Sequence, residues 1–336
     1  MSRYTYGGQA LIEGVLMRGR DAIAVAVRHP DGRIVYAAEP LGSRFHGTRW
    51  AKLPLIRGLV VLYETLIVGT RWLVRTASIQ AEEEEVELGR GAIALMLVFT
   101  LAIGLGVFFF LPLLLSSVIT GNSDSALAQP AVEGLIQVAL FLGYLTLISR
   151  MPDIHRVFQY HGAEHKTIHA LEHDDPLTVE AVQKYPTAHH RCGTEFLVVL
   201  IALSIFTFSI VGKQEPLVMI GSRIVLIPVL AAVGYEVLRI GARFRGNPIV
   251  RAIMWPGILV QMITTKQPTP DMIEVAIVSM EEALRADGEV LPAGGGTLER
   301  APMDEPVPAG AGRIPKAAGE GEAAAPVSID PPIPGS

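Results

Sequence analysis

Charged side chains and cysteines are scarce in this sequence. Only 18% of its 336 residues are charged, whereas 50% are hydrophobic, and the mean hydropathy is +0.40. This composition is typical of a membrane protein and argues against a soluble enzyme of the same length. The single cysteine, Cys192, excludes an internal disulfide and fits a reducing compartment.

The sequence also lacks any basic stripe with interleaved aromatic residues. Its formal net charge is −5, to which an acidic run at residues 82–85 and the C-terminal tail contribute. We therefore expect no nucleic-acid partner. The first residues are polar and glycine-rich, without the apolar core of a signal peptide, so we expect no such peptide.

Four apolar segments are long enough to cross a bilayer, namely residues 91–119, 132–149, 195–211 and 217–238. The segment 121–130 contains no Lys or Arg, whereas the segment 150–194 contains five. The positive-inside rule then places both termini and the segment 150–194 in the cytoplasm. We predict a multi-pass protein of a bacterial-type plasma membrane, with the lipid bilayer as its first partner.

The fold class that follows is a mainly α-helical integral membrane protein with about four transmembrane helices. A small N-terminal β-rich cytoplasmic unit and a cytoplasmic helical histidine-rich segment complete it. Two apolar stretches separated by a Pro-Asp-Gly turn, residues 22–28 and 33–38, predict a hairpin in the β-rich unit. The predicted units are residues 1–50 (β-rich), 51–90 (amphipathic helix and acidic connector), 91–149 (spans), 150–194 (histidine-rich), 195–240 (spans), 241–286 (an interfacial segment interrupted at Trp255-Pro256-Gly257, then an amphipathic helix) and 287–336 (disordered tail).

The stretch 53–74 permits more than one interpretation. It is apolar enough for a span, yet Arg57, Glu64 and Arg71 recur every seven residues on one helical face. Charges at that depth are costly in lipid. An amphipathic helix that lies on the membrane or packs on the bundle is the better interpretation.

Histidines gather in the segment 150–194, since seven of the nine lie between His155 and His190. His161, Glu164 and His165 form an H-x-x-E-H pattern, the inverted form of a metalloprotease zinc helix. In a helix the two imidazoles stand one turn apart on one face, about 6 Å from each other. The pattern predicts a divalent metal site, with zinc as the metal and Glu164 as a general base. The alternative is a polar surface helix with solvated histidines.

A third ligand must come from outside this helix. Glu172 lies about 10 Å beyond His165 along the helix axis and cannot reach the same ion. His189 and Cys192 are the natural suppliers. Cys192 admits two further interpretations, a nucleophile paired with His189 or a buried small residue at the start of a span.

Other polar residues are candidates for orienting a ligand or contacting a substrate: Glu13, Arg18, Asp153, His155, Glu172 and Arg191. Asp153 could equally serve the helix N-terminus. Arg191 could equally anchor the chain at the membrane boundary. Glu13 and Arg18 lie in a glycine-rich stretch that matches no phosphate-binding loop. An ion pair that fixes this stretch is the simpler role for them.

Four separated blocks of the sequence resemble the signature blocks of the YqhQ-like membrane family, also known as domain of unknown function 1385. They are GGQALIEGVLMRG at residues 7–19, PLIRG at 54–58, YHGAEHK at 160–166, and His189 with RCGT at 191–194. Residues 264–283 resemble the family's C-terminal block. The family is described as predicted metal-dependent enzymes, so the resemblance implies a metal and an enzyme without a substrate. His190 stands where the family pattern has proline, which favours His189 over His190 as a ligand.

Three functions from different classes are compatible with these features. The leading hypothesis is a zinc hydrolase at the cytoplasmic face that acts on a membrane-associated peptide, a lipid or an amide. The second is a non-catalytic scaffold or assembly protein, with a membrane protein or peptide partner and a structural His/Cys site. The third is a metal or ion transporter, which is disfavoured because the predicted spans carry almost no acid or histidine at mid-depth.

Overall fold

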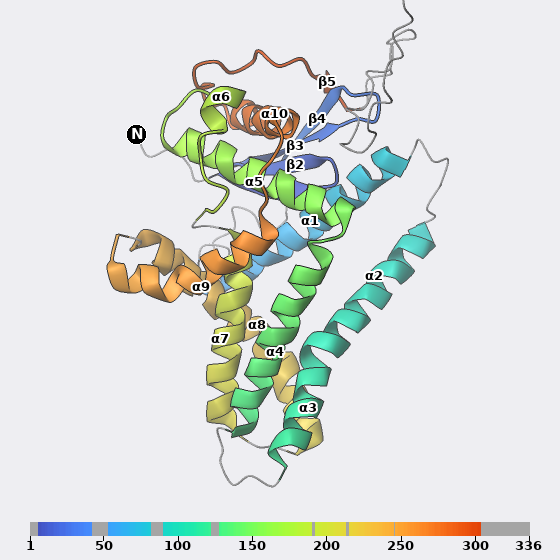
Figure 1. The fold of residues 1–336 in the computed structure, drawn as a ribbon, viewed down its shortest axis with the longest axis vertical. Helices are drawn as coiled ribbons and strands as arrows, with labels where there is room; N and C mark the ends of the chain where they lie inside the picture. The colour runs from blue at the N-terminus through green and yellow to red at the C-terminus, as the bar shows by residue number, and fades with distance from the viewer. Residues whose placement is uncertain are drawn as a thin grey trace, which may run out of the picture.

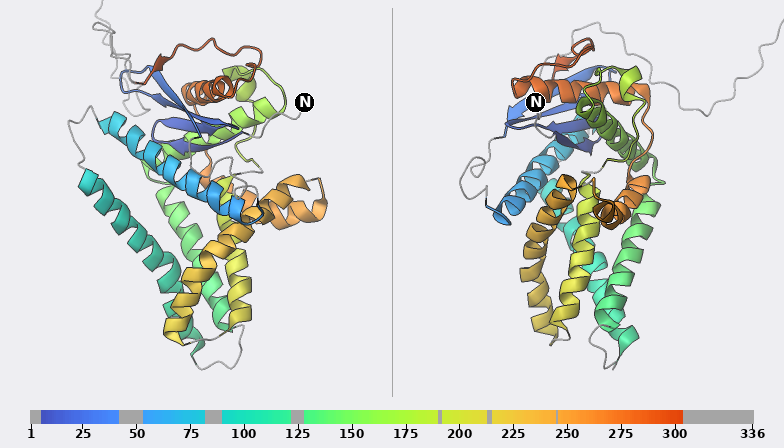
Figure 2. Two further views of the ribbon diagram at one scale, coloured as in Figure 1. Left: turned by 180° about the vertical axis from the view of Figure 1, so that it is seen from behind. Right: turned by 90° about the vertical axis from the view of Figure 1, so that its left-hand side faces the viewer.

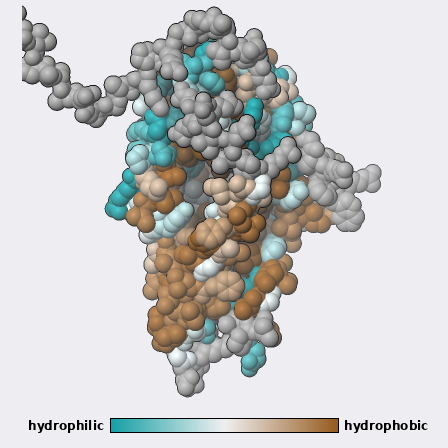
Figure 3. Space-filling model, turned by 90° about the vertical axis from the view of Figure 1, so that its right-hand side faces the viewer, coloured by the Kyte–Doolittle hydropathy of each residue, from teal (hydrophilic) through white to brown (hydrophobic). Residues whose placement is uncertain are grey.

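The molecule has two parts, a bundle of long apolar helices and a body of sheet and helices at one end of it (Figure 1). The computed structural model describes residues 6–41, 53–81, 90–121, 128–189, 192–212, 215–244 and 246–303. Hydrophobic residues gather on the bundle, and hydrophilic residues gather around the sheet (Figure 3). This division matches the patterning of the sequence.

Four helical stretches in the described residues are long and apolar enough to cross a membrane: Ala94–Thr120, Ala128–Ile148, Gly193–Val211 and Ile220–Gly241. The first combines α2 (Arg90–Leu105), a π-helical turn η3 (Gly106–Phe110) and α3 (Leu111–Thr120). The others lie in α4 (Ala128–Ile148), α7 (Gly193–Val211) and α8 (Pro216–Arg243). Large apolar side chains point outward, such as Phe99 and Ile210, which are 65% and 71% exposed. The four membrane-length helices are those predicted.

A five-stranded sheet forms the centre of the other part. Its strands are β1 (Gly7–Leu11), β2 (Gly14–Arg18), β3 (Ala22–Arg28), β4 (Ile34–Pro40) and β5 (Ala301–Pro302), in the spatial order β1-β2-β3-β4-β5. Neighbouring strands are antiparallel except for β4 and β5, which are parallel. The predicted hairpin is β3–β4, with Gly32 in its turn at φ 92°. The glycine-rich stretch before it forms a second hairpin, which the sequence did not reveal.

Both faces of this sheet are covered, which explains the continuous apolar run of β3. Ala24 and Ala26 face α5 (Pro152–Glu172) and α10 (Pro270–Ala286) in one apolar core. Val25 and Val27 face the opposite core, against which α1 (Ile56–Ala81) packs. A strand buried on both faces has no need of the polar alternation seen in half-exposed strands.

Helix α1 runs between the sheet and the bundle (Figure 2). Its charged residues, spaced by seven, each meet a charge on another element. Arg57 Nε donates to Glu236 Oε1 on α8 at 2.7 Å, Arg18 Nη2 on β2 donates to Glu64 Oε2 at 2.6 Å, and Arg71 pairs with Glu39 on β4. The helix therefore packs on both parts of the protein through the face that carries its charges.

Two expectations near the C-terminus are corrected. Helix α9 (Pro248–Thr264) continues through Pro256, where we expected an interruption. Residues 288–303 are ordered against α10, whereas we expected disorder from residue 287 onward. Arg300 lies between the buried carboxylates of Glu281 and Glu282, and β5 adds a short strand to the sheet. An Ala, Gly and Pro-rich composition hid these long-range contacts; residues 304–336 lie outside the described part.

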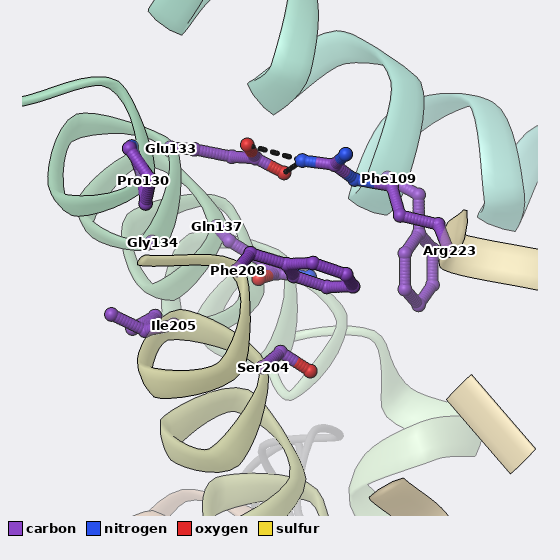
Figure 4. A pocket seen from close by; sticks show the side chains of 9 residues that line it. All are labelled: Phe109, Pro130, Glu133, Gly134, Gln137, Ser204, Ile205, Phe208 and Arg223. Atoms are coloured by element: carbon purple, nitrogen blue, oxygen red, sulfur yellow. Dashed lines mark hydrogen bonds and ion pairs between the residues drawn. The ribbon is translucent and has the colours of Figure 1, made fainter. Parts of the chain in front are cut away.

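A polar cluster lies inside the bundle, between α4, α7 and α8 (Figure 4). Arg223 Nη2 donates to both carboxylate oxygens of Glu133, at 2.7 and 2.6 Å, and its guanidinium lies 4.5 Å from the ring centroid of Phe208. Gln137 donates to the carbonyl of Phe108 in the π-helical turn. From the sequence we expected spans that carry almost no charge. The structure shows that two of the membrane-length helices are joined by this ion pair.

Candidate metal centre

Helix α5 carries the H-x-x-E-H residues and packs closely against the segment after α9. Gly162 permits this packing, because a Cβ there would collide with the carbonyl oxygen of Lys266. The amide of Lys266 also donates to the carbonyl of Phe158 at 2.8 Å. Glycine inside a helix is unfavourable by about 0.5–1 kcal/mol relative to alanine, so its presence here reflects close backbone approach.

His161, His165 and Cys192 form a group whose candidate ligand atoms all lie within 4.8 Å of one another. The imidazole centroids of the two histidines are 4.4 Å apart, and Cys192 Sγ lies 3.2 Å from His161 Nε2. Cys192 reaches them from the residue that precedes α7. Two nitrogens and a sulfur at this spacing are a donor set that suits Zn²⁺.

Backbone carbonyls select the tautomer of both imidazoles. His161 Nδ1 lies 2.8 Å from the carbonyl oxygen of Thr264, and His165 Nδ1 lies 2.5 Å from that of Thr187. A carbonyl oxygen only accepts, so each Nδ1 carries the proton and each Nε2 keeps its lone pair. This is the arrangement in which metal-ligating histidines are usually oriented.

Glu164 lies beside this group and is buried, with 4% exposure. Its Oε2 has no hydrogen-bond partner among the residues that the structure describes. Burial raises the pKa of its carboxyl to about 8, against the lowering effects of His161 and of a hydrogen bond from the backbone of Gly8. Burial also lowers the pKa of His165 and raises that of the Cys192 thiol to about 11. An orphaned buried carboxylate oxygen beside three ligand atoms fits a site made for a cation.

A second group of candidate ligands lies farther along the helix. His189 lies not with His161 and His165 but with His169 and Glu172, and the candidate ligand atoms of these three are also within 4.8 Å of one another. Glu172 is thus separate from the first group, as its place along the helix predicted. Asp153 and His155 are exposed in the first turns of α5 and belong to neither group. Arg191 and His190 lie outside the described residues.

Glu13 and Arg18 take part in separate ion pairs. Glu13 occupies the β1–β2 turn at φ 53° and accepts two hydrogen bonds from Arg156 of α5, at 2.5 and 2.6 Å. Tyr160 donates to the same carboxylate at 3.2 Å. Arg18 instead pairs with Glu64 of α1. Both contacts join the first hairpin to helices, and Glu13 connects it to α5 itself.

Several supporting residues were missed by reasoning from the sequence. The carbonyls of Thr187 and Thr264 hold the imidazoles, Gly8 lies against Glu164, and Gln261 holds the backbone of His189. A backbone carbonyl leaves no trace in residue type. The glycines at positions 8 and 162 were the available signal, because each marks a close approach that a side chain would block.

Comparison with known proteins identifies the family. A model described as "Protein of unknown function (DUF1385)" matches residues 53–286. The chain is also 33% identical over 298 residues to the "Uncharacterized protein YqhQ" of Bacillus subtilis (strain 168), a match that covers 84% of this chain and 93% of that protein. No solved structure matches the chain significantly. The family description names no activity, so metal dependence stays a prediction. On this evidence, the chain belongs to the DUF1385 family.

Proposed function

We propose that this protein is an integral membrane hydrolase that depends on a divalent metal, with its site at the cytoplasmic face. One observation carries the proposal. Glu164, a buried carboxylate with an unpartnered oxygen, lies beside two histidines and a cysteine whose ligand atoms converge. An acid kept in such a place with one oxygen unpartnered is expected where proton transfer is needed.

His161 and His165 would hold the metal through Nε2, and Cys192 would hold it through Sγ. The carbonyls of Thr264 and Thr187 orient the two imidazoles for this role. Zinc bound by three protein ligands supplies Lewis acidity toward a substrate carbonyl or a water molecule. Because only three protein ligands would bind the ion, one coordination position would stay open for the substrate or the water molecule.

Glu164 would act as the general base and acid of the reaction. A cation held by the neighbouring ligands would lower the pKa of Glu164, so that its free oxygen could accept a proton from the attacking water and return it to the leaving group. The backbone amide of Gly8 holds the carboxylate from the other side. The substrate classes that suit a site next to a bilayer are a membrane-associated peptide, a lipid and an amide.

The proposal also includes the orientation of the protein in the membrane. The sheet, α5 and α10 lie together at one end of the bundle (Figure 1), and the basic residues of the segment 150–194 favour the cytoplasm for that end. Both termini then lie in the cytoplasm of a bacterial-type cell. Cysteines introduced at positions 121 and 174 should react with an impermeant reagent from opposite sides of the membrane. Labelling from one side alone would refute this orientation.

The test of the hydrolase uses Glu164→Gln in the full chain purified in detergent. We expect close to one ion at the His161 group to be retained, because glutamine leaves the ligands in place. His161→Ala and His165→Ala should lose it. Cells that carry Glu164→Gln should accumulate the uncleaved substrate, a lipid or a membrane peptide. The purified wild-type protein should cleave this substrate, and the purified variant should cleave it about 10²–10⁴-fold more slowly.

The second candidate is a membrane scaffold whose metal is structural, and the burial of the site favours it. His165, Glu164 and Cys192 are only 2%, 4% and 6% exposed, whereas a hydrolase must admit its substrate. In that case the histidine and Cys192 variants unfold the segment 150–194 and Glu164→Gln is silent. A silent Glu164→Gln in cells and in vitro would replace the hydrolase with the scaffold.

A further inference from the structure

A second group of potential ligands follows the first along helix α5. His169 and Glu172 come from the last turns of the helix, and His189 comes from the segment that leads into α7. Their candidate ligand atoms all lie within 4.8 Å of one another. The ring centroid of His189 lies 4.6 Å from that of His169 and 5.7 Å from that of His165. The two groups are thus neighbours, joined through His165 and His189.

Two of these atoms, which also form a long hydrogen bond, stand at a separation that fits coordination to one ion. His189 Nε2 lies 3.4 Å from Glu172 Oε2. A charge-assisted hydrogen bond between nitrogen and carboxylate spans about 2.7–2.9 Å. Two ligands about 2.0–2.1 Å from a tetrahedral ion stand about 3.4 Å apart. The observed distance matches the edge of such a tetrahedron.

Hydrogen bonds hold the ring of His169 and the backbone of His189 in place. His169 Nε2 lies 2.9 Å from the carbonyl oxygen of Ala188, so Nε2 carries the proton and Nδ1 keeps its lone pair. The side chain of Gln261 bonds both the amide and the carbonyl of His189, each at 2.9 Å. A hydrogen bond from the second ring nitrogen to a carbonyl, as at His169, is typical of histidines that ligate metals.

We propose that His169, Glu172 and His189 bind a second divalent cation beside the one assigned to His161, His165 and Cys192. Two imidazoles and a carboxylate favour a borderline ion such as Zn²⁺ or Co²⁺ over Ca²⁺ or Mg²⁺, which prefer oxygen ligands alone. Glu172 is 24% exposed, so this cation is the more accessible of the two. The inference holds whether the first site is catalytic or structural.

The test is a Co²⁺ titration of the metal-free full-length protein in detergent, followed by elemental analysis. Co²⁺ bound to Cys192 gives an intense thiolate absorption band, whereas Co²⁺ bound to the second group gives only weak bands. We expect two ions per chain in the wild type. Glu172→Gln should bind one ion and keep the thiolate band, and Cys192→Ser should bind one ion without that band.

His173→Ala is the matched control, since His173 directly follows the same helix and belongs to neither group. It should bind two ions. Loss of a ligand should lower the affinity for the second ion by more than the loss of a supporting hydrogen bond, which lowers it about 10–100-fold. If Glu172→Gln loses both ions, the Co²⁺ titration of the wild type decides. Two binding steps, of which only one produces the thiolate band, support the second site. The second site is overturned if the wild type binds only one ion per chain. It is also overturned if both Glu172→Gln and His169→Ala still bind two ions.

Discussion

Gln261 holds His189 by two hydrogen bonds to its backbone. Gln261 Oε1 accepts from the amide of His189 and Gln261 Nε2 donates to its carbonyl, both at 2.9 Å. Gln261 is fully buried in α9, at 0% exposure. This one side chain therefore connects the apolar helix α9 to the segment that carries His189 and leads to Cys192.

Gln261→Ala should damage the second cation site more than the first. The change leaves two buried backbone groups of His189 without partners, which costs about 1–3 kcal/mol each. We expect a lower melting temperature in detergent and a second-ion affinity reduced by about 10–100-fold. The first ion should be retained, because His161 and His165 are held by Thr264 and Thr187 instead.

The control for that change is Gln159→Ala, which removes the same side chain from α5. Gln159 makes a solvent-exposed hydrogen bond to the carbonyl of Gln267, so its loss should leave melting and both ions nearly unchanged. Equal effects from the two substitutions would show that the two hydrogen bonds from Gln261 to the backbone of His189 have no special role.

Gly8→Ala tests the contact between the first hairpin and Glu164. A Cβ on Gly8 would collide with the carbonyl oxygen of Leu16 and stand 3.0 Å from Glu164 Cδ. Glu164 must then move, so we expect hydrolysis to fall as steeply as in Glu164→Gln while the first metal remains. Gly7→Ala is the matched control, since a Cβ there meets nothing within 4 Å. Full activity in Gly8→Ala would remove Glu164 from the mechanism.

The sequence predicted those parts of the fold whose signals are local. Membrane-length helices are encoded by runs of apolar residues, and the β3–β4 hairpin is encoded by two β-branched stretches around Pro30 and Gly32. The helix that carries His161, Glu164 and His165 could be predicted from ligand spacing alone. Each of these features is set by residues within one segment.

The sequence did not reveal features that depend on distant contacts. β1 and β2 are rich in glycine and carry weak strand signals; their pairing depends on the cover that α5 and α10 provide. Arg57, Glu64 and Arg71 showed a period, but their partners on α8, β2 and β4 could not be inferred from it. The division of the histidines into two groups likewise depends on how residues 187–189 and Cys192 lie against α5.

The ordered segment after α10 provides a third prediction. Arg300, 8% exposed, pairs with Glu281 and Glu282, which are 1% and 7% exposed. Removing one partner of a buried pair typically costs about 3–5 kcal/mol. A chain that ends at residue 287, or Arg300→Ala in the full chain, should melt markedly lower in detergent. A chain that ends at residue 303 keeps these contacts and should melt like the full protein; if all three behave alike, residues 288–303 do not stabilise the fold.

The ion pair inside the bundle provides the last prediction. Glu133 and Arg223 are 14% and 12% exposed, and they connect α4 to α8 beside the ring of Phe208 (Figure 4). Charges among apolar helices are expensive unless paired, so Glu133→Gln or Arg223→Met alone should cost about 3–5 kcal/mol. The double variant removes both charges and should melt closer to the wild type than either single one. A double-mutant cycle in detergent measures this coupling, which should exceed about 1 kcal/mol because the two side chains are in contact. Additive losses would mean that each charge interacts mainly with other groups, and the pair would then have no role in joining the two helices.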